Sequence, residues 1–266
     1  MSTTISASFP AAQTRPLALP SMGTVFSSLL RADLTTQWRN RRSSMLVILI
    51  PVIILISWKG FVPLRGGAFV MSNCITVGLT AIGLLGYANS IARDRDKGIF
   101  QRLRVAPASN WAIMASRLTV QLIMIAIMTI VTFIVGYEVD KISLPITNYI
   151  LGFLAALLSG AVYLSLGQVI VGRIKNPETV NATSRLIYIV FIMVGMFAEF
   201  GAMDNLGKVI NLITKYSPYG AVKTIVSGGL TPTLWTTDTT TALIMTLAYT
   251  AVFTFLGVRW FRWSTR

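Results

Sequence analysis

Six stretches of the chain are nearly free of charged residues, and each approaches the length that a helix needs to cross a bilayer. That length is about 20 mostly apolar residues. The stretches are Ser43–Trp58, Ala68–Ala92, Ile113–Tyr137, Asn148–Val171, Arg185–Ala202 and Thr241–Val258. The first is short and contains Pro51, which kinks a helix but is tolerated in membrane bundles where neighbours satisfy the freed carbonyl. Residues 43–266 are therefore predicted to form an all-α integral membrane domain with six transmembrane helices.

The composition agrees with an integral membrane protein. Of the 266 residues, 54% are hydrophobic and only 12% are charged, and the mean hydropathy is +0.68. A soluble domain usually has about 25% charged residues. Halving that fraction removes the polar surface that a water-exposed fold needs, so the bilayer is expected to cover the apolar surface.

The basic residues alternate between the segments that join the spans, and this predicts the orientation. Of the 23 Lys and Arg residues, 17 fall in one set of alternate segments and 6 in the other. Cytoplasmic segments carry the positive excess. We therefore expect a multi-pass protein of the cell (inner) membrane with both termini in the cytoplasm. The net charge of +14 could also indicate nucleic-acid binding, but a nucleic-acid binder would not alternate its charge between apolar spans.

Two segments precede the first span. Residues 1–21 are rich in Ser, Thr, Ala and Pro and are predicted to form a disordered cytosolic tail. In residues 22–42 apolar side chains recur every fourth position, at Phe26, Leu30, Leu34 and Trp38. This spacing predicts an amphipathic helix that lies in the membrane interface and contacts lipid. A cytosolic helix packed on another subunit is the alternative, and one helix could do both.

The segment between the second and third spans, Arg93–Trp111, carries the most information. Charges alternate in sign from Arg93 to Lys97, which allows ion pairing within the segment or with a partner. Gly98 interrupts this run, and Pro107 disfavours a helical conformation at the residue before it. A short cytosolic helix, a turn and then the third span are predicted. A positively charged loop without any partner would fit the same composition.

The run Lys97-Gly-Ile-Phe-Gln-Arg-Leu-Arg-Val-Ala-Pro107 resembles the first cytoplasmic loop of the ABC type-2 permease family, in its drug-resistance and nodulation-factor export branch. Two features depart from the family pattern: Asp replaces Glu at 94 and 96, and Ala106 replaces Thr or Ser. The resemblance covers the chain from about Met22 to the end. It implies that this loop docks on an ABC ATPase subunit. The docking residues that it implies are Asp94, Asp96, Gly98, Arg102, Arg104 and Pro107.

Two further segments join spans. In the second internal loop, residues 172–184, Pro177 and the small polar residues are interpreted as a plain turn that is followed by a helix start, although a second ATPase contact is possible. Residues 203–238 hold apolar patches that are too short to span, as is typical of re-entrant or interfacial segments. We expect an external re-entrant helical hairpin there. Its turn is predicted at Ser217, Pro218, Tyr219 and Gly220, which also resemble the family's turn.

The chain holds no chemistry of its own that could drive transport. It has no Gly-x-x-x-x-Gly-Lys-Ser/Thr run, so ATP and Mg²⁺ would be bound by a partner subunit. Histidine is absent and Cys74 is the single cysteine, so we expect no catalytic residue, metal site or cofactor in this chain. Glu199, near the outer end of the fifth span, could line the path or face the outer headgroups.

These observations predict the permease subunit of an ATP-driven ABC exporter for an amphiphile such as a drug, lipid, peptide or glycan. A second permease copy, most simply a homodimer, would double the small bundle and place the path at the subunit interface. An ion-coupled secondary transporter would need a titratable residue at mid-membrane, and none is present there. A membrane-embedded lipid-modifying enzyme would need clustered polar groups at one interface, and a scaffold or sensor would favour a hydrophilic external segment.

Overall fold

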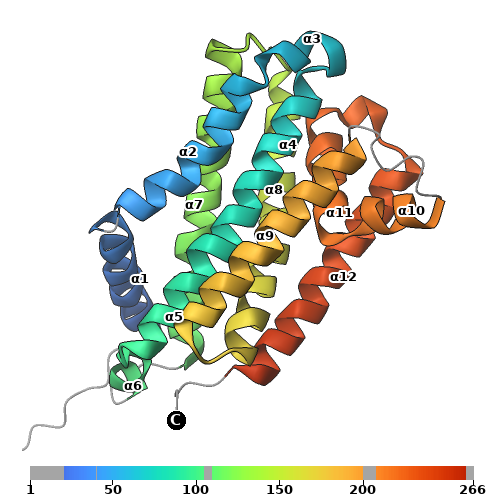
Figure 1. The fold of residues 1–266 in the computed structure, drawn as a ribbon. Helices are drawn as coiled ribbons and strands as arrows, with labels where there is room; N and C mark the ends of the chain where they lie inside the picture. The colour runs from blue at the N-terminus through green and yellow to red at the C-terminus, as the bar shows by residue number, and fades with distance from the viewer. Residues whose placement is uncertain (1–20, 40, 105–109, 200–207, 262–266) are drawn as a thin grey trace, which may run out of the picture.

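The computed structural model describes residues 21–39, 41–104, 110–199 and 208–261, which form helices joined by short turns (Figure 1). No strand occurs among these residues. Five of their helices are long and apolar enough to cross a membrane: Gly67–Asp96, Trp111–Glu138, Ile146–Arg173, Pro177–Ala198 and Thr237–Trp260. The predicted all-α membrane fold class is therefore confirmed, and each of these helices contains most of one predicted span.

The first predicted span is bent. Helix α2 (Arg41–Ser57) is followed by a 3-10 turn, η1 (Lys59–Phe61), and by the short α3 (Val62–Arg65), and the pieces Met45–Ser57 and Lys59–Arg65 meet at 50°. Counting this pair as one span brings the described total to six. Pro51 lies inside α2 and is buried against Gly78 of the next span. Pro51 thus faces the bundle, where Gly78 has no side chain and leaves room for the proline ring.

The second span runs through the centre of the bundle in three pieces: α4 (Gly67–Thr80), a π-helical stretch η2 (Ala81–Ala88) and α5 (Asn89–Asp96). In its most apolar window 89% of the residues are buried, against 17% in α12 (Thr237–Trp260). Gly83 explains the close fit to α8 (Ile146–Arg173), because a Cβ there would lie 2.5 Å from the carbonyl carbon of Tyr163. Other helices cover this central one, whereas most of the α12 window is exposed.

The fifth span differs most from its predicted range of 185–202. Helix α9 (Pro177–Glu199) begins at Pro177, whose missing N–H and fixed φ suit the first helical position. The Asn176 side chain accepts a hydrogen bond from the backbone N–H of Glu178 at 2.8 Å, which caps the start. The helix therefore includes two polar turns that the hydropathy pattern left outside the span.

A helical hairpin precedes the last span, in the segment predicted as re-entrant. Helices α10 (Lys208–Tyr216) and α11 (Pro218–Leu230) meet at Ser217, whose hydroxyl accepts from the backbone N–H of Gly220 at 3.1 Å. A Cβ at Gly220 would collide with the carbonyl oxygen of Thr214, so the turn needs glycine there. A short 3-10 turn, η4 (Pro232–Leu234), joins the hairpin to α12. The four predicted turn residues thus lie where the two helices meet.

Tyr219 and the end of α11 hold this hairpin against the bundle. The ring of Tyr219 is 1% exposed and packs where Gly195 of α9 leaves room. At the other end of α11, the Asn148 side-chain amide of α8 donates to the carbonyl of Leu230 at 2.9 Å. The hairpin is therefore packed along α8 and α9, beside the upper half of α12 in Figure 1.

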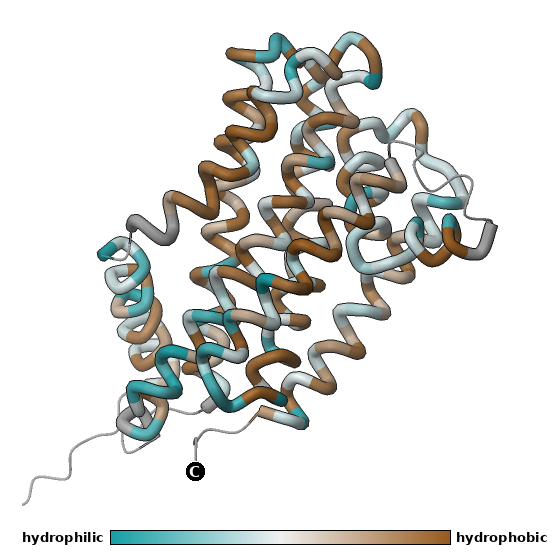
Figure 2. The backbone as a smooth tube through the Cα atoms, in the orientation of Figure 1, coloured by the Kyte–Doolittle hydropathy of each residue, from teal (hydrophilic) through white to brown (hydrophobic). Residues whose placement is uncertain are grey.

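The remaining helices gather at the opposite end of the bundle. Helix α1 (Met22–Arg39) packs on α7 (Asn110–Glu138), while α6 (Ile99–Arg104) and the end of α12 lie at the lower end in Figure 1. Figure 2 shows hydrophilic residues concentrated in α1 and α5, whereas α2 and α9 are largely hydrophobic. The segments predicted to share one side of the membrane therefore share one end of the bundle, and which side that is remains a prediction.

Candidate functional site

The loop that carries the family-like motif begins as a helix–turn–helix. Helix α5 ends at Asp96, and Gly98 adopts φ +67°, a left-handed conformation that glycine accepts without strain. The N–H of Gly98 donates to the carbonyl of Arg95 at 3.1 Å, which closes the turn before α6. Phe100 of α6 is fully buried and packs edge-on against Phe261 at 6.0 Å between ring centroids. The loop is thus anchored to the bundle at its start.

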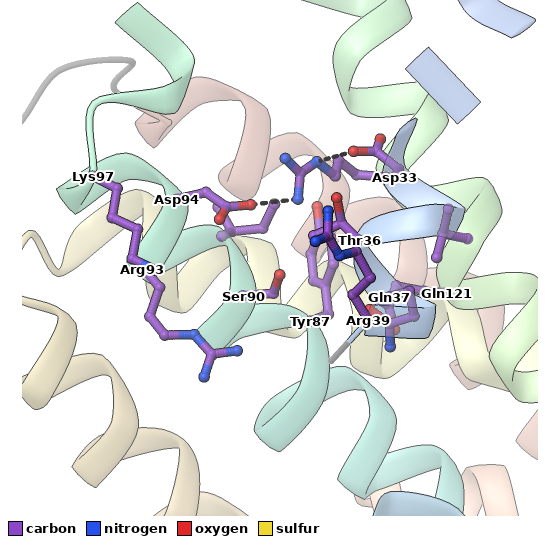
Figure 3. Close-up of a pocket in the computed structure, with 13 residues that line it drawn as sticks. Asp33, Thr36, Gln37, Arg39, Tyr87, Ser90, Arg93, Asp94, Lys97 and Gln121 are labelled. Carbon is purple, nitrogen blue, oxygen red and sulfur yellow. Dashed lines mark hydrogen bonds and ion pairs between the residues drawn. The ribbon is translucent and has the colours of Figure 1, made fainter. Parts of the chain in front are cut away.

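A set of ion pairs joins three elements beside this turn. Arg117, seven residues into α7, pairs through its Nε with Asp33 of α1 at 3.1 Å. Its Nη1 donates to Asp94 of α5. The hydroxyl of Ser116 donates to the second Asp33 oxygen at 2.6 Å. We call Asp33, Asp94, Ser116 and Arg117 the hub, and in Figure 3 dashed lines mark the ion pairs of its two carboxylates, Asp33 and Asp94.

Burial makes the hub electrostatically costly unless its charges stay paired. The side chains of Asp33, Asp94 and Arg117 are only 14–16% exposed. Burial raises the pKa of the Asp33 carboxyl above its ordinary value, and the nearby Arg117 and the Ser116 hydrogen bond pull that pKa back down. The neighbouring Asp94 adds a smaller raising effect. Arg117 therefore holds two carboxylates that would otherwise repel each other.

Arg95 connects the same turn to the far side of the bundle. Its side chain is 2% exposed and donates to the carbonyls of Val171 at 2.6 Å, Ile174 at 2.6 Å and Lys175 at 3.0 Å. These carbonyls lie at the end of α8, where the helix leaves acceptors without partners of its own. Arg95 therefore caps α8 and fastens the second internal loop to α5.

The structure brings together only part of the predicted docking set. Asp94 lies in the hub, whereas Asp96 is exposed and Gly98 forms the turn. Arg102 and Arg104 lie in α6, but the placement of their side chains, like that of Glu199 at the end of α9, is outside the described part of the chain. Pro107 also lies outside the described residues.

The apolar stripe of α1 faces in two directions. Phe26 and Leu30 are half-buried, while Leu34 is 37% exposed and Trp38 is 77% exposed. Asp33 lies between them in sequence and turns toward α7. The helix therefore uses one edge to hold the bundle and presents Leu34 and Trp38 outward.

The sequence analysis did not single out Asp33, Arg95 or Arg117 as site residues. A signal existed for two of them. Asp33 is the single acidic residue in the first 93 positions, and Arg117 is the single charged residue inside the predicted span Ile113–Tyr137. A charge that stands alone inside an apolar span is expected to have a partner, and pairing those two would have predicted the contact between α1 and α7.

Comparisons with known proteins point to one family. No curated protein sequence matches the chain. A family model described as "ABC-2 family transporter protein" matches residues 59–259, which include every described helix from α3 to α11 and nearly all of α12. Members of this family are membrane-embedded subunits of ABC transporters. Since the match extends over most of the 266 residues, the chain belongs to the ABC-2 family of transporter proteins, as a permease subunit.

Proposed function

We propose that this permease subunit works in an ATP-driven exporter, and that force from a separate ATPase subunit enters at the hub. The observation that carries the proposal is the pairing of Arg117 with Asp33 and Asp94, because it ties the interfacial helix, the loop helix and a membrane-spanning helix at one point. A displacement of any one of these three elements would therefore shift the other two.

The chain needs such a partner because it has no means of binding ATP itself. Its sequence contains no phosphate-binding Gly-x-x-x-x-Gly-Lys-Ser/Thr loop. The exposed Asp96 and the turn at Gly98 present a surface next to the hub, and the family-like motif continues from there into α6. We assign ATPase docking to this surface. The surface and both termini would then lie on the cytoplasmic side of the inner membrane.

A second copy of the chain would complete the transport path. The outward faces of α2 and α9 are apolar, with Ile53 at 52% and Ile189 at 55% exposure. A groove of about 470 Å³ between α2, α5 and α9 is lined by apolar residues of α2 and also by polar side chains, including Asn89, Asn181 and Arg185. Lipid tails cannot satisfy polar groups. We therefore assign the α2–α9 face to a homodimer interface and the groove to the path of an amphiphilic substrate.

Coupling can be separated from docking by two substitutions on the same helix. The permease is co-expressed with candidate ABC ATPases, and the complex is reconstituted in liposomes for ATP turnover. Asp96→Asn is expected to weaken ATPase binding, because Asp96 is exposed. Asp94→Asn is expected to leave binding intact but to lower transport-linked turnover severalfold, because Asp94 lies inside the hub. Glu138→Gln, at an exposed acidic residue at the far end of α7, serves as the matched control.

The exporter proposal fails if no ABC ATPase co-purifies with the chain, or if the purified chain moves cargo without nucleotide hydrolysis. The hub assignment fails separately if Asp94→Asn and Glu138→Gln behave alike. Dimer formation through α2 and α9 has its own test. Ile53→Cys and Ile189→Cys should cross-link two copies, whereas Phe255→Cys on the exposed face of α12 should not.

A further inference from the structure

A polar cavity of about 380 Å³ lies between α1, α5 and α7, directly beside the hub (Figure 3). In Figure 3 the α1 side chains of Thr36, Gln37 and Arg39 lie across from the α5 side chains of Ser90, Arg93 and Lys97. A water molecule occupies roughly 30 Å³ in the liquid. The cavity therefore has room for a ligand many times larger than water.

The lining of this cavity has an unbalanced charge. It includes four cationic side chains, Arg39, Arg93, Lys97 and Arg117, and two carboxylates, Asp33 and Asp94. Both carboxylates are paired with Arg117. Within the described part of the chain no ion pair involves Arg39, Arg93 or Lys97. Three positive charges consequently converge on one cavity without a counter-charge from the described protein.

A buried amide at the cavity wall points to the same kind of ligand. Gln121 of α7 is only 6% exposed and lines the cavity, yet none of the hydrogen bonds between described residues involves its side chain. A buried amide donor normally has a partner. The Ser90 hydroxyl also lines this cavity. Neutral donors beside several cations match the non-bridging oxygens of a phosphate group.

The position of the cavity favours a lipid phosphate over a soluble anion or an acidic peptide. Trp38 and Leu34 lie on the outward face of α1, within five residues of Arg39, at 77% and 37% exposure. Trp111, at the start of α7, is 75% exposed. Aromatic side chains of this kind mark the headgroup level of a membrane. A bound acidic peptide would leave these apolar groups uncovered, whereas a phospholipid places its acyl chains against them.

We infer that the cavity between α1, α5 and α7 binds the headgroup of one anionic phospholipid. Arg39, Arg93 and Lys97 contact its phosphate, and Gln121 and Ser90 donate hydrogen bonds to its oxygens. The bound lipid would hold the free edge of α1 to α5 across the cavity, alongside the hub that holds it to α7. This makes the attachment of α1 depend on the anionic lipid content of the membrane.

The test measures lipid binding by the full-length purified chain in detergent, using native mass spectrometry. Dioleoylphosphatidylglycerol should bind as a single saturable adduct, and dioleoylphosphatidylcholine should bind far more weakly. Each of Arg39→Gln, Arg93→Gln and Lys97→Gln should weaken phosphatidylglycerol binding about fivefold, as expected for one basic side chain near a lipid phosphate. The triple variant should lose roughly a hundredfold.

Two matched controls keep this result specific. Arg31→Gln removes an exposed charge from the same helix, and Lys175→Gln removes one from the α8–α9 loop, and neither residue lines the cavity. Both should bind phosphatidylglycerol like the unmodified chain. Equal losses in these controls would show that overall charge attracts the lipid, and would overturn the site.

Three other outcomes would also overturn the inference. One is unchanged phosphatidylglycerol binding in the triple variant. Another is competition by free glycerol phosphate at the same concentration as the lipid, which would make the ligand a soluble phosphate compound. The third is a triple variant that keeps lipid binding but loses its ATPase, which would assign the cavity to an acidic segment of that partner. The lipid measurement needs no ATPase, so it can fail while the proposed function stands.

Discussion

Removing Arg117 should cost more than removing either carboxylate that it pairs with. Arg117→Gln leaves both Asp33 and Asp94 without a cation, in a site where the side chains are 14–16% exposed. Asp33→Asn leaves Arg117 paired with Asp94, and the Asn oxygen can still accept from Ser116. Burial already raises the pKa of Asp33, which shows that its charge is held at a cost. Neutralising Asp33 removes that desolvation cost, which offsets part of the stability lost with the ion pair.

The magnitude lies between two limits. Exposed ion pairs contribute about 0.2–1 kcal/mol, and breaking a fully buried pair by removing one partner costs about 3–5 kcal/mol. For this partly buried hub we expect about 2–4 kcal/mol for Arg117→Gln and about 1–2 kcal/mol for Asp33→Asn. The double variant should cost less than the sum by about 1–2 kcal/mol, which is the coupling between the two side chains.

Amide hydrogen exchange in α1 is the measurement, because exchange reports local opening of single elements as well as global unfolding. The matched control is the exposed pair between Lys215 and Asp238, whose Nζ–Oδ2 distance is 2.7 Å and whose side chains are 42% and 52% exposed. The same cycle read out in α10 should give no measurable coupling, because solvent screens this exposed pair. If the hub coupling equals that of the control, or if Asp33→Asn costs as much as Arg117→Gln, the electrostatic account of the hub is wrong.

Three further predictions concern packing, capping and pH. Gly83→Ala should lower the melting temperature, at a cost of about 1–3 kcal/mol, because its Cβ would press on the α8 backbone, whereas Gly86→Ala should not, since its nearest outside atom is 3.8 Å away. Arg95→Gln should cost about 2–4 kcal/mol and expose the α8–α9 loop to trypsin, because it removes three hydrogen bonds from a charged donor. Asp140→Asn should raise the melting temperature at neutral pH. Burial raises the pKa of the Asp140 carboxyl, and the nearby Lys59 opposes this shift. The protonated carboxyl therefore contributes stability at low pH, and that stability is lost as pH rises through the folded-state pKa. Melting curves should show the difference shrinking toward about pH 4, near the ordinary pKa of Asp.

The hydropathy pattern predicted the spans because each covers an apolar run, and helix-terminal chemistry predicted where the hairpin turns. The hydropathy pattern did not predict helix ends where a helix extends beyond its apolar run. Helix α9 starts at Pro177 because proline suits a first helical turn and Asn176 caps it, and neither effect contributes to hydropathy. The π-helical stretch Ala81–Ala88 was not predictable either, because its apolar composition does not differ from that of an α-helical span.

The hub shows a second limit of sequence reasoning. Asp94 was predicted from a local motif, but its partner Arg117 lies 23 residues after it, and Asp33, which shares that partner, lies 61 residues before it. Alternation of charge from Arg93 to Lys97 indicated ion pairing within the segment or with a partner, and the family resemblance implied docking for both Asp94 and Asp96. In the structure three consecutive residues have three different roles: Asp94 pairs inward with Arg117, Arg95 caps α8, and Asp96 is exposed. Helical periodicity separates them, since neighbours in sequence point about 100° apart around the helix.

The route from the hub into the bundle follows from the continuity of one helix. Asp94 and Arg95 lie on α5, which continues through η2 into α4, the most buried span in the described structure. Because α5 and η2 are parts of one continuous helix, a displacement of α5 would also strain or shift η2 inside the bundle. The π-helical stretch is the weak part of that route: its hydrogen bonds follow a less favourable spacing, and single π turns recur at functional sites. On its α8 side it is wedged at Gly83, and the Tyr87 hydroxyl donates to Gln168 at 2.7 Å. Under the proposed function, we therefore expect movement at the hub to change the register between η2 and α8, rather than to bend helices at the membrane surface.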